Sequence, residues 1–275
     1  MTKHEYAEEV CKYINAQGYQ TEITDHNRNN GSYVAVAIKR SPDDMVAPVF
    51  NIGDESEDPV IFAKKILEVV PAKINTESLT DIMNDKEQVL SRCTYVLVNT
   101  ELNRERESLV RRQVNNTLEM HFKVDITDIL EDARVSLEKK HIKNLGITEQ
   151  ELYVRAYVNT MEKYPYSLQT MGDILGLKLP EEVPDMYVLT NNVKTNGAGA
   201  ILYQGIKEVL ENKVGDDPIL IPSSIHEWIV IPAWLGEKSI ITAMIREVNS
   251  SVLSEEDVLS DRPYELITDG VLFEL

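Results

Sequence analysis

The chain has 275 residues, of which 43% are hydrophobic and 27% are charged; its 46 acidic and 28 basic residues give a net charge of −18. This composition is typical of a globular protein and excludes an intrinsically disordered chain. The excess of acid disfavours direct binding to nucleic acid, because phosphate backbones are bound by surplus Lys and Arg.

The first third of the chain is predicted to form a helix, a three-stranded antiparallel meander and a second helix. Tyr6, Val10 and Ile14 recur at helical spacing over residues 4–17. The Asn-Gly pair at 30–31, flanked by alternating residues, predicts a β-hairpin, and residues 45–52 supply a third strand. Pro59 then favours the first turn of a helix over residues 58–70.

The middle of the chain is predicted to contain two strands. Residues 93–99 (CTYVLVN) have the continuous apolar character of a buried strand. Residues 118–126 (LEMHFKVDI) alternate between an apolar face and a polar face. We expect His121, which lies on the polar face, to be solvated. No second histidine lies nearby, so we predict no metal site.

Residues 176–186 (GLKLPEEVPDM) indicate a boundary, because they combine two prolines and three acids without a regular period. We therefore expect an N-terminal α+β region over residues 1–180 and a C-terminal α+β unit over 181–275. The C-terminal unit is predicted to contain a mixed or antiparallel sheet packed by two helices. Its predicted elements are strands at 186–190, 198–203, 218–222 and 228–233, helices at 205–214 and 238–248, and a hairpin around Asp269-Gly270. The last helix has an apolar stripe formed by Ile240, Ile241, Met244, Ile245 and Val248.

The stretch ILIPSSIHEWIVIP, residues 219–232, carries the strongest chemical signal. Ser223, Ser224, His226 and Glu227 are residue types used in nucleophilic catalysis, in which an acid orients the histidine that activates a serine. In extended backbone Ser224 and His226 share a face, whereas Glu227 points away. The chain lacks a G-x-S-x-G elbow here, and the second histidine of H-E-x-x-H is missing.

A structural role explains the same residues. Two apolar arms flank the polar residues, and serine hydroxyls readily bond backbone groups at a bend between strands. The nearby Gly197 and Gly199 do not form a dinucleotide-binding loop, because Leu202 occupies the place of the third glycine. The sequence thus predicts neither a cofactor nor a metal.

Five segments carry a family resemblance: YVLTN at 187–191, Asn196-Gly197-Ala198, ILY at 201–203, PSSIHE at 222–227 and VLSD at 258–261. Together they resemble an uncharacterised domain-of-unknown-function family of Gram-positive gut bacteria, closely over 148–275 and more loosely before. Trp228 and Ile229 depart from the smaller aliphatic residues that are frequent in that family. The resemblance implies a cytoplasmic bacterial protein and supplies no reaction. It directs attention to Asn196, Gly197 and Asp261 as well as Ser223, Ser224, His226 and Glu227.

Our leading hypothesis is a cytoplasmic, non-catalytic binding or interaction protein. The apolar run of about 20 residues that a membrane span requires is absent, and the first residues are acidic where a signal peptide is apolar. The sequence does not identify the partner; residues 146–275 hold 9 basic and 21 acidic residues, a net charge of −12, which is compatible with a basic protein. Two alternatives stay open: a hydrolase that uses Ser224 or Ser223 with His226, and an acidic mimic of nucleic acid.

Overall fold

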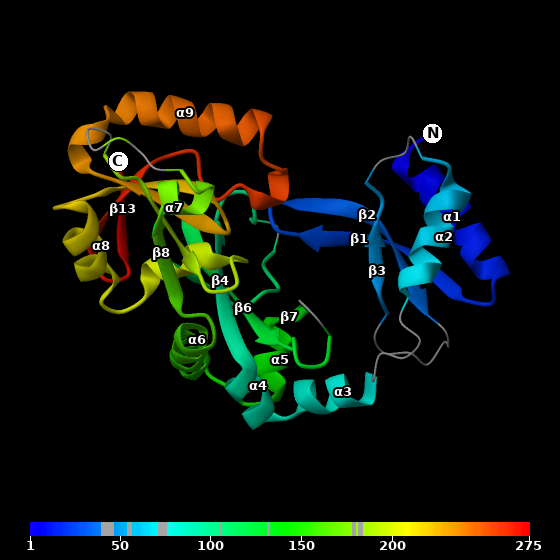
Figure 1. Cartoon of the computed structure of the whole chain (residues 1–275). Coiled ribbons are helices and arrows are strands. Elements are labelled where there is room, and N and C mark those ends of the chain that lie inside the picture. Colours follow the sequence, from blue (N-terminus) through cyan, green and yellow to red (C-terminus); the bar gives the residue numbers. More distant parts are fainter. Residues whose placement is uncertain are drawn as a thin grey trace. The chain divides into compact units, whose positions relative to one another are not determined.

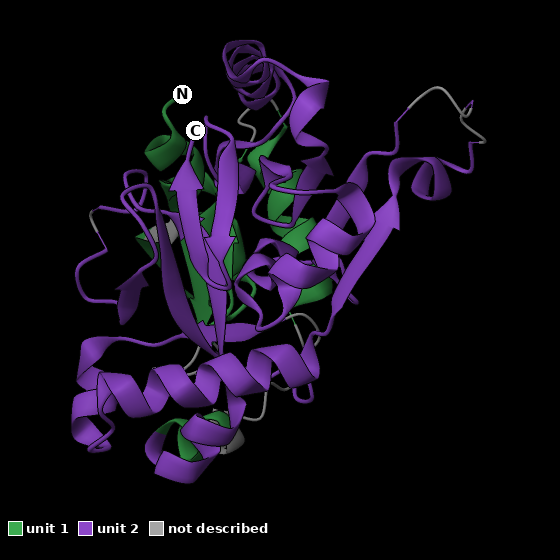
Figure 2. Cartoon of the chain, turned by 90° about the vertical axis from the view of Figure 1, so that its left-hand side faces the viewer, with its two compact units in different colours: residues 1–83 green, residues 84–275 purple. Residues whose placement is uncertain are grey.

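The computed structural model describes residues 1–39, 47–53, 57–70, 76–104, 106–130, 133–177, 180 and 184–275. The chain is an α+β protein with antiparallel sheets, and it divides into two compact units, residues 1–83 and 84–275 (Figure 2). The boundary predicted at residue 180 falls inside the second unit. Residues 178–179 and 181–183 of that segment lie outside the described residues.

The first unit has the predicted order of helix, three-stranded meander and helix (Figure 1). Thr2 begins the first helix, because its hydroxyl accepts from the Glu5 amide while the Glu5 carboxylate accepts from the Thr2 amide. The Asp58 carboxylate likewise caps the second helix, which has Pro59 in its first turn. The elements are α1 (Lys3–Ala16), β1 (Gln20–Arg28), β2 (Gly31–Lys39), β3 (Val49–Asn51) and α2 (Pro59–Val69), with the sheet in the order β1-β2-β3.

The β1–β2 hairpin turns one residue before the predicted Asn-Gly pair. Arg28 pairs with Gly31, so Asn29 and Asn30 form the turn and Asn30 takes a φ of 61°. Both helices pack on one face of this sheet and enclose a buried apolar cluster. Its members are Tyr6, Ala7, Val10, Cys11, Ile14, Val36, Ile38, Ile52, Ala63 and Ile66. Helix α3 (Thr76–Asn84) follows and reaches the unit boundary.

The second unit opens with a four-stranded antiparallel sheet and the helix that covers it. Strand β4 coincides with the predicted strand 93–99, and its Tyr95 amide donates to the Thr160 hydroxyl of α6 at 3.0 Å. The Asn159 side chain of α6 donates to the carbonyls of Leu90 and Cys93, where α4 gives way to β4. The elements are α4 (Lys86–Arg92), β4 (Cys93–Asn99), β5 (Arg111–Gln113), β6 (Leu118–Asp125), β7 (Arg134–Ser136), α5 (Lys139–Asn144) and α6 (Glu149–Lys163).

Strand β6 forms within the predicted range, but the expectation that His121 is solvated was wrong. Glu119, His121 and Asp125 are all buried. They tolerate burial because they bond to other polar groups: Glu119 Oε1 lies 2.7 Å from His121 Nε2 and 3.5 Å from an Arg111 guanidinium nitrogen. Burial lowers the pKa of His121, although the Glu119 carboxylate opposes this shift. Burial likewise lowers the pKa of Lys123 to about 8.

The rest of the second unit is built on a six-stranded antiparallel sheet in the order β13-β12-β10-β11-β9-β8. Among the described helices, none combines the length and hydrophobicity of a transmembrane span. The elements are β8 (Tyr166–Thr170), α7 (Met171–Leu175), β9 (Tyr187–Asn191), η1 (Gly197–Leu202), α8 (Ile206–Val214), β10 (Ile219–Ser224), β11 (Glu227–Ile231), α9 (Lys238–Ser251), η3 (Glu255–Asp257), β12 (Tyr264–Thr268) and β13 (Val271–Glu274).

One predicted strand was wrong: residues 197–202 form the 3₁₀ helix η1. Their small side chains let the segment lie against the β10–β11 connection, where the Ala198 amide donates to the Ile225 carbonyl. The Trp228 indole then donates to the Ala198 carbonyl at 2.8 Å. These bonds to a neighbouring hairpin replace the ladder that a strand would need.

Candidate functional site

The PSSIHE residues span the end of β10, its tight connection to β11 and the first residue of β11, and His226 is held at both of its ring nitrogens. Its Nδ1 accepts a hydrogen bond from the Asn196 amide at 2.9 Å, so the ring proton of the neutral imidazole lies on Nε2. That nitrogen lies 3.1 Å from the Asp257 carboxylate. Both nitrogens are therefore engaged, and neither is available to take a proton from a serine.

The two serines bond elsewhere. The buried Ser224 hydroxyl accepts from the backbone amide of His226 at 3.0 Å, and the Ser223 hydroxyl donates to the Glu227 carboxylate at 3.3 Å. Asp261 accepts from the Asn249 side chain at 2.7 Å. A hydrolase mechanism would first have to break the bonds that hold Ser224 and His226. What the present arrangement does is satisfy backbone groups where two strands join.

Gly197 makes a close backbone approach to this corner. A Cβ atom at this position would stand 2.2 Å from Thr190 Oγ1 and 2.6 Å from both the Asn191 amide nitrogen and the His226 carbonyl oxygen. Thr190 also donates to that carbonyl, at 2.8 Å. The structure thus brings Asn196, Gly197, Ser224 and His226 together around backbone groups.

His226→Ala is expected to lower the free energy of unfolding by about 1–2 kcal/mol, because the Asn196 amide loses its acceptor and Asp257 loses its donor. Urea denaturation followed by circular dichroism measures the change. Glu227→Ala, which removes only the contact to the Ser223 hydroxyl, is the control and should cost less. Equal stability of His226→Ala and the unmodified protein would contradict a role in holding the corner.

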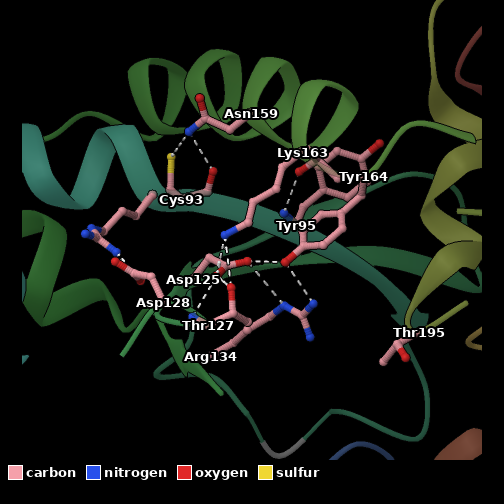
Figure 3. A network of polar contacts seen from close by, with 12 residues as sticks. Cys93, Tyr95, Asp125, Thr127, Asp128, Arg134, Asn159, Lys163, Tyr164 and Thr195 are labelled. Atoms are coloured by element: carbon pink, nitrogen blue, oxygen red, sulfur yellow. Dashed lines mark hydrogen bonds and ion pairs between the residues drawn. The ribbon is translucent and has the colours of Figure 1, made fainter. Parts of the chain in front are cut away.

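A second polar cluster lies where α6 ends against β6 and β7 (Figure 3). Its centre is Asp125, which is 1% exposed. The carboxylate accepts from the Lys163 ammonium at 2.7 Å, from the Thr127 amide and hydroxyl at 3.0 and 2.7 Å, and from the Tyr164 hydroxyl. The Arg134 guanidinium lies 3.7 Å away and also donates to the Tyr164 hydroxyl at 3.0 Å.

These contacts keep Asp125 ionised and Tyr164 neutral. Burial alone would raise the pKa of Asp125, but hydrogen bonds from Lys163, Tyr164 and Thr127 outweigh it and hold the pKa well below its usual range. Burial raises the pKa of Tyr164, and the adjacent Asp125 carboxylate raises it further. Neither group is poised to exchange a proton near neutral pH, so this cluster joins secondary-structure elements. Within the described part of the chain, no three His, Cys, Asp or Glu side chains gather where they could hold a metal ion.

Large exposed apolar side chains recur at four-residue spacing on and beside α9. The helix packs on the six-stranded sheet through Ile241 and Ile245, which contact Ile219 and Ile231. The other half of the predicted apolar stripe faces solvent. We call this surface the α9 face; it consists of Trp234 (74% exposed), Ile240 (57%), Met244 (56%), Val248 (44%) and Val252 (74%).

The family model described as a family of unknown function, DUF5688, matches residues 3–266. The chain belongs to the DUF5688 family. No curated protein and no solved structure matches this DUF5688 chain. This match supports one part of the resemblance drawn from the sequence motifs, namely that the chain belongs to an uncharacterised domain family.

In this DUF5688 protein, sequence reasoning missed two acids that organise their surroundings. Asp257 was not among the predicted site residues; its carboxylate accepts from the Ser254 hydroxyl and lies 3.1 Å from His226 Nε2. Asp125 was assigned only to the polar face of its strand. One sequence signal points to the structural role of Asp125: it is a carboxylate at the end of a regularly alternating strand, and Asp128 follows three residues later.

Proposed function

We propose that this protein is a non-catalytic interaction protein of the bacterial cytoplasm, which binds a basic amphipathic helix of a partner protein on the α9 face. The single observation that carries the proposal is the exposure of large apolar side chains at four-residue spacing. Ile240, Met244, Val248 and Val252 follow one another at that interval, with Trp234 just before the helix. Contiguous exposed apolar surface marks interaction sites in soluble proteins.

The geometry of α9 explains why these side chains stay outside the core. Successive helical residues are rotated by about 100°, so Ile240 and Met244 point to one side of Ile241 and Ile245. The sheet beneath covers the second pair and leaves the first pair exposed. A helix of a partner could cover the first pair in the same way, because amphipathic helices dock through anchors at i, i+3, i+4 and i+7.

Charge supports a basic occupant. Residues 233–257, which include α9 and its flanks, contain five acidic and two basic residues. Residues 146–275 carry a net charge of −12. A partner helix with Lys or Arg beside its apolar stripe would be attracted by this field, and its association would slow as salt screens the charges.

The test uses a synthetic 18-residue helical peptide with leucines at i, i+3, i+4 and i+7 and lysines elsewhere. We expect it to bind, and we expect the double variant Ile240→Ser/Met244→Ser to bind at least tenfold more weakly. Trp234 reports the event, since docking moves its exposed indole into an apolar contact and shifts its emission to shorter wavelength. Trp228 is fully buried and should not respond.

The matched control is Val154→Ser/Val158→Ser, which removes two exposed apolar residues at the same spacing on α6. This control should bind the peptide as the unmodified protein does. Equal binding by both double variants, or equal binding of a peptide with glutamates in place of lysines, would overturn the proposal. A dimer that the Ile240→Ser/Met244→Ser variant abolishes would overturn it too, by assigning the α9 face to a second copy.

A further inference from the structure

Strand β13 lies at one end of the six-stranded sheet. Within the described residues, no strand pairs with that side of β13. A cavity of about 520 Å³ runs beside it, lined by residues 272–274, the turn at 115–117, Glu101 and Arg262. This volume lies within the range of about 300–1,000 Å³ that is usual for ligand sites. The edge and the cavity are formed entirely by unit 2.

The direction of the β13 backbone groups follows from two hydrogen bonds. The Leu275 amide donates to the Pro263 carbonyl, so residues 273 and 275 turn their amides toward β12. Because alternate residues of an antiparallel strand bond to opposite sides, Leu272 and Glu274 turn theirs outward. The Leu272 carbonyl indeed accepts from the Asn115 side chain at 3.3 Å, on the side away from β12.

Three outward groups are left for a ligand: the Leu272 amide, the Glu274 amide and the Glu274 carbonyl. The described residues supply no partner to these groups. Two donors and one acceptor along one extended segment match the backbone of another extended segment. Small molecules seldom present groups at that spacing, whereas every extended polypeptide does.

We infer that the outer edge of β13 binds an extended segment of a partner polypeptide, which adds a seventh strand to the sheet. Main-chain hydrogen bonds supply affinity in this mode, and alternate side chains supply selectivity. Phe273 is exposed and lines the cavity. It lies opposite a non-hydrogen-bonded position of the added strand, where side chains approach most closely, so a β-branched or aromatic residue fits there. This site is separate from the α9 face.

Amide hydrogen exchange of the full chain, read by NMR, tests the inference with the synthetic peptide acetyl-Lys-Thr-Val-Thr-Val-Thr-amide. We expect saturating peptide to slow exchange of the Leu272 and Glu274 amides at least tenfold and to leave the Phe273 amide, which already faces β12, unchanged. Two further versions of the peptide each carry N-methyl groups on one of the two alternating sets of amide nitrogens. Only the version whose unmethylated amides face β13 should bind. Unchanged exchange at Leu272 and Glu274 would overturn the inference.

Two substitutions at one position separate backbone from side chain. Glu274→Pro and Glu274→Ala both remove the carboxylate that pairs with Arg262, but only the proline removes the outward amide. We expect Glu274→Ala to bind the peptide within about threefold of the unmodified chain and Glu274→Pro to bind at least tenfold more weakly. Equal binding by the two variants would overturn the inference. So would protection of both amides without peptide in a dimer, since β13 would then pair with a second copy; if the proline variant does not fold, the methylated peptides decide.

Discussion

Gly197→Ala is expected to lower the free energy of unfolding of unit 2 by about 3 kcal/mol or more. The added Cβ would stand far inside the contact distance of three atoms, and two of them, the Asn191 amide nitrogen and the His226 carbonyl oxygen, belong to the backbone. Backbone atoms cannot rotate away, so η1 would have to move from the β10–β11 connection. The φ of Gly197 lies outside the left-handed region, so the effect is steric.

Gly199→Ala is the matched control for this prediction, because both glycines lie in η1. A Cβ on Gly199 would meet a ring carbon of Tyr95 at 3.0 Å, and a side chain can shift by a few tenths of an ångström. We expect a loss of about 1 kcal/mol. Urea denaturation followed by the fluorescence of Trp228, whose indole bonds to the intervening Ala198, measures both variants. Equal losses would contradict the close approach at Gly197.

Asp125→Asn is expected to cost about 3 kcal/mol at pH 7. The amide keeps the shape of the side chain and can still accept from Tyr164, but it removes the charge that balances Arg134 and Lys163. Leaving Arg134 without its carboxylate partner costs more free energy than leaving Lys163 unpaired. The Arg134 side chain is only 12% exposed, whereas the more exposed Lys163 can turn into solvent. Thermal and urea denaturation of the two proteins at pH 7 measure the difference.

The same substitution should change the dependence of stability on pH. The pKa of Asp125 is lower in the folded chain than in the unfolded chain, so its ionisation stabilises the fold at pH values above the unfolded pKa of about 3.9. This contribution is lost as pH falls below that value toward the folded pKa. The gap between the unmodified protein and Asp125→Asn should therefore be full at pH 6–7 and narrow below about pH 4.

Asp128→Asn provides the control for both measurements. Asp128 pairs with Arg92 at 2.6 Å, three residues from Asp125, but its side chain is 54% exposed. Solvent screens such a pair, so we expect a change of no more than about 1 kcal/mol. A loss for Asp128→Asn as large as that for Asp125→Asn would mean that burial of Asp125 is not the source of the effect.

Local patterns predicted most elements of this protein because they depend on neighbouring residues alone. The alternation of 118–126 predicted β6, and the Asp269-Gly270 pair predicted the hairpin of β12 and β13, with Gly270 at a φ of 76°. Burial depends on what lies across from an element. The same alternation therefore did not predict that Glu119 and His121 would be buried and hydrogen-bonded to each other.

Two further differences have the same origin. The small residues of η1 were compatible with a strand, and only the contact of Ala198 with the β10–β11 connection favours a 3₁₀ helix. The carboxylate that meets His226 belongs to Asp257, 31 residues further along, and no pattern in the sequence connects the two. The apolar stripe of α9 was predicted correctly, but a stripe does not reveal how much of it the sheet will cover.

Strand β4 has a consequence for how the chain is made. It is almost entirely buried, and two of its polar contacts come from far downstream: the Tyr95 hydroxyl donates to the Gly199 carbonyl, and the Asn99 side chain donates to the Leu259 carbonyl, 160 residues later. On the ribosome, this segment emerges long before the residues that complete its surroundings. Unit 2 should therefore mature only after residue 259 has been synthesised, and messages truncated before codon 259 should yield aggregating, chaperone-dependent products.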